Sequence, residues 1–161
     1  MRLAPQEIRT FFITSVTHER RSILQTDRMA RLFLDVLQDN RTKSHFLLHE
    51  FVVMPNHFHL LITPAYDMPL EKAVQFIKGG FSYRAKKELD YRFEVWERSF
   101  TEHRVKDADD YEYHRAYIHE NPVRRGMVRA AEEYSYSSAY PGALVDSCPP
   151  ALKRSFKSTD P

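Results

Sequence analysis

The sequence predicts an α+β fold of the ferredoxin-like, split βαβ type. Its apolar and polar periodicities change along the chain in the order strand, helix, strand, strand, helix, strand, and one further helix follows. Only the turn signal Met54-Pro55-Asn56 separates the second and third strands, so they pair as a tight antiparallel hairpin. We therefore expect a four-stranded antiparallel sheet with helices on one face and a tyrosine-bearing helix on the other.

Runs of β-branched and aromatic residues, or of alternating polarity, predict the four strands. These runs are residues 11–17 (FFITSVT), 45–53 (HFLLHEFVV), 57–63 (HFHLLIT) and 99–106 (SFTEHRVK). The second strand carries His45 and His49, which we expect to be exposed or at the rim of the sheet.

Apolar residues at helical spacing predict the helices. Thr26 and Asp27 supply cap residues for a first helix that reaches residue 41. The second helix, residues 70–89, contains Gly79-Gly80, a pair that would kink it or end its first half. The third helix, residues 107–120, begins with acidic residues, as the helix dipole prefers. It should stop near Pro122, because the residue before a proline avoids the helical conformation.

Composition limits the kinds of protein that the chain can be. The 161 residues match one globular domain, and 42% of them are hydrophobic, which is enough for a core. Lys and Arg number 24 against 22 Asp and Glu, a balance that excludes a polycation and allows nucleic-acid binding only through a local patch. One cysteine excludes an internal disulfide and a Cys-rich zinc module.

The chain is expected to form one domain over residues 1–140, followed by a proline-containing, flexible tail over residues 141–161. That tail holds four of the nine prolines and shows no apolar periodicity. No apolar run approaches the ~20 residues of a membrane span, and MRLAPQEIRT lacks the apolar core of a signal peptide. We therefore expect a cytoplasmic protein without a membrane partner.

The first candidate site is the sequence His57-Phe58-His59. Alternate strand residues share one face of a sheet, so both imidazoles should lie on the side opposite Phe58, Leu60 and Ile62. Their spacing suits two ligands of one metal ion. A pair of surface histidines on a half-buried strand is the commoner origin of such a pattern, since two histidines are not a full coordination set.

The second candidate site is on the third helix. Tyr113, Tyr117 and Asn121 are four residues apart in turn and share one helical stripe. Tyrosines on such a stripe are usually core residues with a solvated hydroxyl. The helix therefore matters chemically only if it lies across the face that carries His57 and His59.

The third feature is a set of basic clusters in a nearly neutral chain. A cluster of this kind favours an anionic partner, although a solvated helix face is its commoner origin. The residues are Arg124, Arg125 and Arg129 after the third helix, Lys78, Arg84, Lys86 and Lys87 on the second helix, and Arg104 and Lys106 on the fourth strand.

Taken together, the motifs resemble the single-tyrosine HUH transposases, and most closely the REP-associated tyrosine transposases of bacteria. The resemblance runs from about residue 11 to about residue 139 and rests on FVVMPNHFHLLITP, FIKGGFS, VWERSFTEHRVKD, YHRAYIHENPVRRGMV and EEYSYSSA. An HxH motif after MPN is specific when YIxxNPVxxG follows it further along the chain.

The resemblance implies a role for four residues. His57 and His59 match the histidines of the HUH motif, and Tyr117 matches its nucleophilic tyrosine. Asn121 matches the polar residue that helps to hold a divalent ion, Mg²⁺ or Mn²⁺, although related transposases often carry Gln there. The implied activity is single-strand DNA cleavage and strand transfer through a 5′-phosphotyrosine intermediate.

The resemblance also implies partners and a location. The substrate would be single-stranded DNA with hairpin or palindromic repeats, handled by a monomer or homodimer at the bacterial nucleoid. DNA phosphates would be contacted by Lys78, Arg84, Arg104, Arg124 and Arg125. Two other readings stay open: a non-catalytic module that binds single-stranded nucleic acid on the same fold, and, with less support, a zinc hydrolase.

Overall fold

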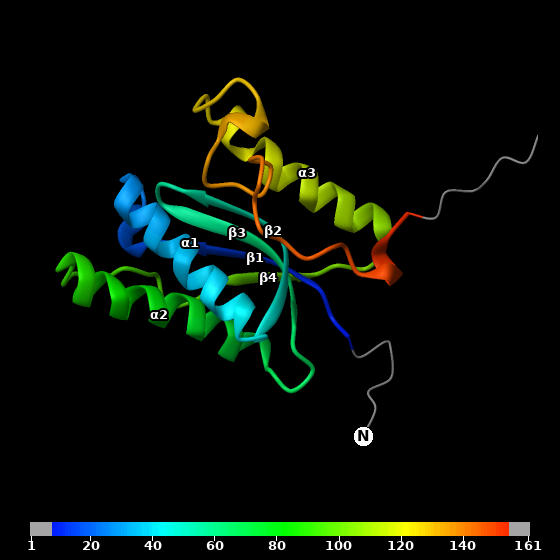
Figure 1. Ribbon diagram of the computed structural model, residues 1–161, viewed down its shortest axis with the longest axis horizontal. Helices are drawn as coiled ribbons and strands as arrows, with labels where there is room; N and C mark the ends of the chain where they lie inside the picture. Colours follow the sequence, from blue (N-terminus) through cyan, green and yellow to red (C-terminus); the bar gives the residue numbers. More distant parts are fainter. Residues whose placement is uncertain (1–7, 155–161) are drawn as a thin grey trace, which may run out of the picture.

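The computed structural model describes residues 8–154 and contains a four-stranded antiparallel sheet (Figure 1). Its strands are β1 (Phe11–Val16), β2 (Phe46–Met54), β3 (His57–Pro64) and β4 (Thr101–Arg104), in the spatial order β2-β3-β1-β4. β2 and β3 form the predicted hairpin, in which Met54 opposes His57. β1 pairs with both β3 and β4, so the predicted sheet is confirmed, although β4 is shorter than expected.

Helices cover both faces of the sheet. α1 (Asp27–Thr42) and α2 (Leu70–Leu89) lie together on one face, and α3 (Ala108–Arg124) crosses the other (Figure 1). Short 3₁₀ helices within residues 8–154 are η2 (His18–Arg20), η3 (Ala131–Glu133) and η4 (Pro150–Leu152). This is the α+β arrangement that the sequence predicts, with the tyrosine-bearing helix α3 on its own side.

The alternation of side chains along β3 divides the core into two parts. Phe58, Leu60 and Ile62 belong to the larger apolar cluster, which includes the buried residues of α1 and α2. Leu61 belongs to a smaller cluster that includes Ile118 of α3. Because successive side chains of a strand point to opposite faces, His57 and His59 share the side of Leu61. The histidine pair therefore lies on the face that α3 covers.

The Gly79-Gly80 pair does not end α2, which continues to Leu89. A Cβ atom on Gly80 would lie 3.2 Å from Cγ1 of Val36 in α1, which is tighter than side-chain carbons normally approach. Gly80 thus allows α1 and α2 to pack closely. This packing offsets the cost of glycine in a helix, which is about 1 kcal/mol.

α3 extends further than the sequence predicts, through Pro122 to Arg124. Pro122 lacks an N–H and its ring crowds the preceding turn, but it lies in the last turn of the helix, where the carbonyls of Asn121 and Val123 still accept the N–H of Arg125. The predicted end at residue 120 is therefore wrong. The extension places Asn121 and Arg124 on the same continuous helix as Tyr117.

Part of the segment predicted to be a flexible tail lies against β2. The N–H of Asp146 donates to the carbonyl of Leu48 at 2.7 Å, and its carboxylate accepts from the N–H of Leu48 at 2.9 Å. Arg41 of α1 pairs with the same carboxylate at 3.0 Å. Residues 155–161 lie outside the described residues. Within residues 8–154, no helix is long and apolar enough to cross a membrane.

Candidate active site beneath helix α3

The two histidines of β3 form a buried pair. His57 is 7% exposed and His59 is 5% exposed, and their ring centroids are 4.9 Å apart. Nδ1 of His57 donates to Oδ1 of Asn56 at 2.7 Å, and Nδ1 of His59 lies 2.8 Å from the hydroxyl of Thr14. Both contacts are made by Nδ1, so Nε2 of each ring is the nitrogen left for a ligand.

The environment of the pair keeps both imidazoles neutral. Burial lowers the pKa of His57 to about 4, and the positive charges of Arg125 and Arg20 act in the same direction. Burial lowers the pKa of His59 to about 3, with further contributions from His57 and Arg125. A neutral imidazole is the form that coordinates a metal ion, so the pair needs no proton release near neutral pH.

Tyr117 reaches the pair from α3. Its ring centroid lies 5.3 Å from that of His59, and its edge approaches Phe12 of β1 at 5.9 Å. The guanidinium of Arg124 lies 4.4 Å from the centroid of the Tyr117 ring and donates to the Tyr117 carbonyl at 3.2 Å. The Tyr117 ring thus contacts both His59 and the cation of Arg124.

Asn121 follows Tyr117 by one turn of α3 and is 3% exposed. Its Oδ1 atom is buried and has no hydrogen-bond partner among the described residues. A buried carbonyl oxygen without a partner lowers the stability of the fold by about 1–3 kcal/mol. A hydrogen-bond donor or a cation at Oδ1 of Asn121 would remove this cost. Two neutral imidazoles, and an unpaired amide oxygen on the helix that carries Tyr117, are donor types that a divalent cation accepts.

The basic residues separate into two groups. Arg124 and Arg125 end α3, and the positive charges of both act on His59. Lys78 and Arg84 belong to α2, on the other face of the sheet. Lys78 donates to the carbonyl of Glu97 at 2.8 Å, Arg84 pairs with Glu88 at 2.6 Å, and Arg104 is an exposed residue of β4. Of these predicted basic residues, Arg124 and Arg125 are the ones whose charges act on the histidine pair, and Arg20 of η2, which was not predicted, acts on His57 as well.

Sequence reasoning missed a buried carboxylate that holds α3 in place. Glu50 of β2 accepts from Nε2 of His119 at 2.7 Å and from Nε of Arg115 at 3.2 Å, and Ser138 also donates to it. Burial raises the pKa of the Glu50 carboxyl, but these hydrogen bonds outweigh burial and hold the pKa below its ordinary value. The ionised Glu50 therefore fastens the tyrosine helix to the sheet of its own chain.

Comparison with known proteins identifies the family. The family model described as "Transposase IS200 like" matches residues 10–121, which is most of the chain. The protein therefore belongs to the IS200-like transposase family, as its motifs predict.

Its most informative relatives within the family are REP-associated tyrosine transposases. The chain is 28% identical to the REP-associated tyrosine transposase of Escherichia coli K12, over 80% of this chain and 75% of the relative. It is also 28% identical to a Haemophilus influenzae protein described as a putative member of the same group, over 80% of this chain and 78% of that one.

Solved structures agree with this comparison. A REP-associated tyrosine transposase bound to a REP hairpin matches with a TM-score of 0.67 and 28% identity, over 86% of this chain and 81% of that one. A Deinococcus radiodurans protein described as a putative transposase shares the fold at a TM-score of 0.53 and 22% identity, over 75% of this chain and 97% of that one.

Proposed function

We propose that this protein is a REP-associated type of tyrosine transposase that cuts and rejoins hairpin-containing single-stranded DNA. The observation that carries the proposal is the neutral, buried pair His57 and His59 with the Tyr117 ring 5.3 Å from His59. The family and the relative bound to a REP hairpin support DNA as the substrate.

Tyr117 is the proposed nucleophile. Its phenolic oxygen attacks phosphorus in the single strand, an O–P bond forms, and the bond from phosphorus to the 3′ oxygen breaks. The 3′ oxygen leaves as a hydroxyl, and the DNA that follows stays joined to Tyr117 through its 5′ phosphate. A second 3′-OH reverses the step and releases the tyrosine. Each step exchanges one phosphate ester for another, so no ATP is required.

His57, His59 and Asn121 are proposed to hold a divalent cation, Mg²⁺ or Mn²⁺. When bound, such an ion neutralises charge on the phosphate during the substitution. Two imidazoles suit Mn²⁺ better than Mg²⁺, which prefers oxygen ligands. Thr14 and Asn56 orient the two rings through their Nδ1 atoms.

The cations of α3 are proposed to position the DNA backbone. Arg124 and Arg125 lie beside the histidine pair and would contact phosphates near the cleavage point. Lys78, Arg84 and Arg104 lie further away, so we assign them to more distant parts of a hairpin substrate. The contacts of Glu50 with α3 are compatible with a monomer that uses its own tyrosine, and a homodimer that exchanges α3 would make the same contacts between its subunits.

The proposal places the catalytic domain in residues 1–140, with residues 141–161 as an appended segment, in a bacterial cytoplasmic protein that acts at the nucleoid. All the side chains assigned to chemistry precede residue 141. The contacts of Asp146 with Arg41 and Leu48 make the first part of that segment a strap along β2.

A covalent-adduct assay tests the proposed function. A 3′-labelled single-stranded oligonucleotide carrying the hairpin repeats that flank the gene is incubated with protein and Mn²⁺, and adducts are separated in denaturing gels. Tyr117→Phe should remove the adduct while binding persists. Tyr113→Phe is the matched control, because Tyr113 lies one turn earlier and is 67% exposed.

Two results would count against the proposal. An adduct that survives in Tyr117→Phe would assign the nucleophile to another tyrosine. Binding without any adduct in the wild-type protein would favour the non-catalytic binding module.

A further inference from the structure

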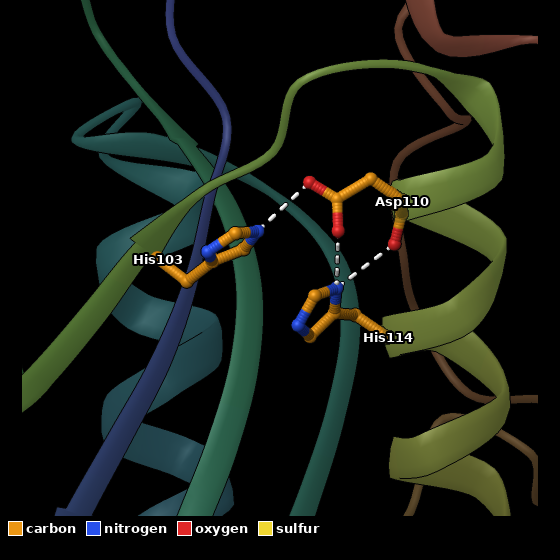
Figure 2. Close-up of side chains that lie close together, drawn as sticks. All are labelled: His103, Asp110 and His114. Atoms are coloured by element: carbon orange, nitrogen blue, oxygen red, sulfur yellow. Dashed lines mark hydrogen bonds and ion pairs between the residues drawn. The ribbon is translucent and has the colours of Figure 1, made fainter.

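A second cluster of metal-binding side chains lies where β4 meets the first turns of α3 (Figure 2). His103 projects from β4, and Asp110 and His114 project from α3, one turn apart. Nε2 of His103 lies 2.8 Å from one oxygen of the Asp110 carboxylate, and Nδ1 of His114 lies 3.1 Å from the other. One ligand atom from each residue lies within 4.8 Å of the other two.

The carboxylate of this cluster is ionised, which a cation ligand requires. Burial raises the pKa of Asp110, but the N–H of Lys106 and the ring of His103 donate to it, and its pKa lies below the ordinary value. The side chains of Asp110 and His114 are 18% and 13% exposed, and that of His103 is 41% exposed. The open side at His103 leaves room for water to complete a coordination shell.

The separations suit an ion after a small adjustment. Ligands bonded to zinc at about 2.0–2.2 Å in a tetrahedron lie roughly 3.3 Å from one another. The contacts of 2.8 and 3.1 Å reach different oxygens of the Asp110 carboxylate, and the three ligand atoms lie within 4.8 Å of one another, so the side chains would have to rotate to meet at one ion. Two imidazoles and one carboxylate select Zn²⁺, Co²⁺ or a similar transition metal over Mg²⁺.

We propose that His103, Asp110 and His114 form a second cation site that takes Zn²⁺ or a chemically similar ion. This site is separate from the His57 and His59 pair. Its ligands come from β4 and α3, so a bound ion fastens the start of the tyrosine helix to the edge strand of the sheet.

The cluster also touches the aromatic packing around Tyr117. The ring of His114 lies 4.5 Å from that of Phe12, and Phe12 packs against both His59 and Tyr117 at 5.2 and 5.9 Å. An ion at Asp110 would fix His114 and thereby the surface on which Tyr117 rests. This effect on cleavage rests on the proposed function, whereas ion binding itself does not.

The competing interpretation is a hydrogen-bonded cluster that binds no ion. In that case both imidazoles donate to Asp110, and His114 also donates to the Asp110 carbonyl at 2.8 Å. The two interpretations differ in one measurable property. Only a cation site binds a transition metal in a way that requires the His103 side chain.

Cobalt titration separates them. Co²⁺ is added to the full-length His57→Ala/His59→Ala variant, which lacks the other pair, and visible absorption is recorded. We expect one Co²⁺ per chain and a rise in melting temperature with Zn²⁺. Both signals should vanish when His103→Ala is added and persist when His45→Ala is added as the control.

His103→Gln guards against loss of folding, because an amide still donates to Asp110 while its nitrogen is a poor metal ligand. This variant should fold normally, as judged by circular dichroism, and bind no Co²⁺. The proposal would be overturned if the His57→Ala/His59→Ala variant showed no cobalt absorption. It would also be overturned if that absorption stayed unchanged when His103 is replaced. Neither result depends on whether the protein cuts DNA.

Discussion

Two histidine clusters lie at helix α3, one beneath it and one that includes residues of its first turns. They differ in the hydrogen-bond partners of their imidazoles. His57 and His59 are buried, and their Nδ1 atoms contact an amide and a hydroxyl. His103 and His114 instead share the carboxylate of Asp110. The first cluster leaves both Nε2 atoms without a protein partner among residues 8–154, whereas the second is bonded as it stands. Burial without a negative partner thus keeps imidazoles neutral and able to bind a cation. A carboxylate partner attracts a cation, but its hydrogen bonds also satisfy the imidazoles when no cation is bound.

The largest expected effect concerns the buried pair. His57→Ala and His59→Ala should each abolish DNA cleavage, because one remaining imidazole cannot retain a weakly held Mg²⁺ or Mn²⁺. EDTA should do the same to the wild-type protein, while DNA binding largely persists through backbone contacts. Single-turnover cleavage and gel-shift binding measure both properties.

The matched substitution in the other cluster is His103→Gln, which keeps a donor for Asp110. It should lower cleavage far less than either substitution in the buried pair, because it acts on Tyr117 only through the packing of His114 and Phe12. Cleavage that resists EDTA would refute the metal site. An equal loss of cleavage activity in His103→Gln and in the variants of the buried pair would show that the two clusters do not differ in function.

The second effect is on the pH dependence of folding. The pKa values of His57 and His59 in the folded protein are about 4 and about 3, against 6.5 for an ordinary histidine. Below pH 6.5 these two histidines bind protons in the unfolded chain but stay neutral in the folded chain. The free energy of unfolding therefore falls as the pH falls below 6.5. Between pH 7 and 5 this amounts to about 2–4 kcal/mol for the pair.

Urea unfolding in EDTA at both pH values, on the wild type and on His57→Ala/His59→Ala, measures this difference. The variant should lose less stability than the wild type over this interval. His49 is also buried with a lowered pKa, but it is present in both proteins and cancels. The carboxyl groups of Glu50 and Asp110 titrate below this window. Equal losses in the two proteins would contradict the assigned pKa values.

Part of this contrast could be predicted from the sequence. The period of two along β3 placed Phe58 in the core and His57 and His59 on the opposite face, and the turn at residues 54–56 fixed the hairpin. The helical stripe placed Tyr117 and Asn121 on one side of α3. The predictions of the hairpin and of the faces of β3 are confirmed because they depend on short-range spacing, whereas a shared site for Tyr117 and Asn121 stays a prediction.

The features that were missed depend on contacts between elements. Thr14 meets His59 only through the register of β1 with β3, and Glu50 meets His119 only once α3 is docked. His49 was expected to be exposed or at the rim, and this is wrong: it is 1% exposed, because its ring bonds to the Ser147 carbonyl and the Thr63 hydroxyl.

A smaller effect is expected from the residue that orients His59. Thr14→Val removes the hydroxyl 2.8 Å from Nδ1 but keeps the shape of the side chain. Loss of such an orienting partner usually lowers metal affinity by about 10–100-fold. Calorimetric titration with Mn²⁺ measures the change. Thr101→Val is the control, because Thr101 is the partner of Thr14 on β4 and is exposed; unchanged affinity in Thr14→Val would remove its orienting role.

The smallest effect concerns the cations at the end of α3. Arg124 and Arg125 are exposed, so replacing them costs little stability. Each phosphate contact releases counterions, so the double alanine variant should bind single-stranded DNA more weakly for all sequences, with a salt dependence flatter by about one to two units. Arg92→Ala is the control, since Arg92 is an exposed residue between α2 and β4 that pairs with Asp90.

Arg124 also lies over the Tyr117 ring, so its single variant should reduce the cleavage rate of bound DNA, whereas Arg125→Ala should reduce binding alone. An unchanged salt slope in the double variant would show that these arginines do not contact phosphates, and the buried pair would then act without the cations beside it.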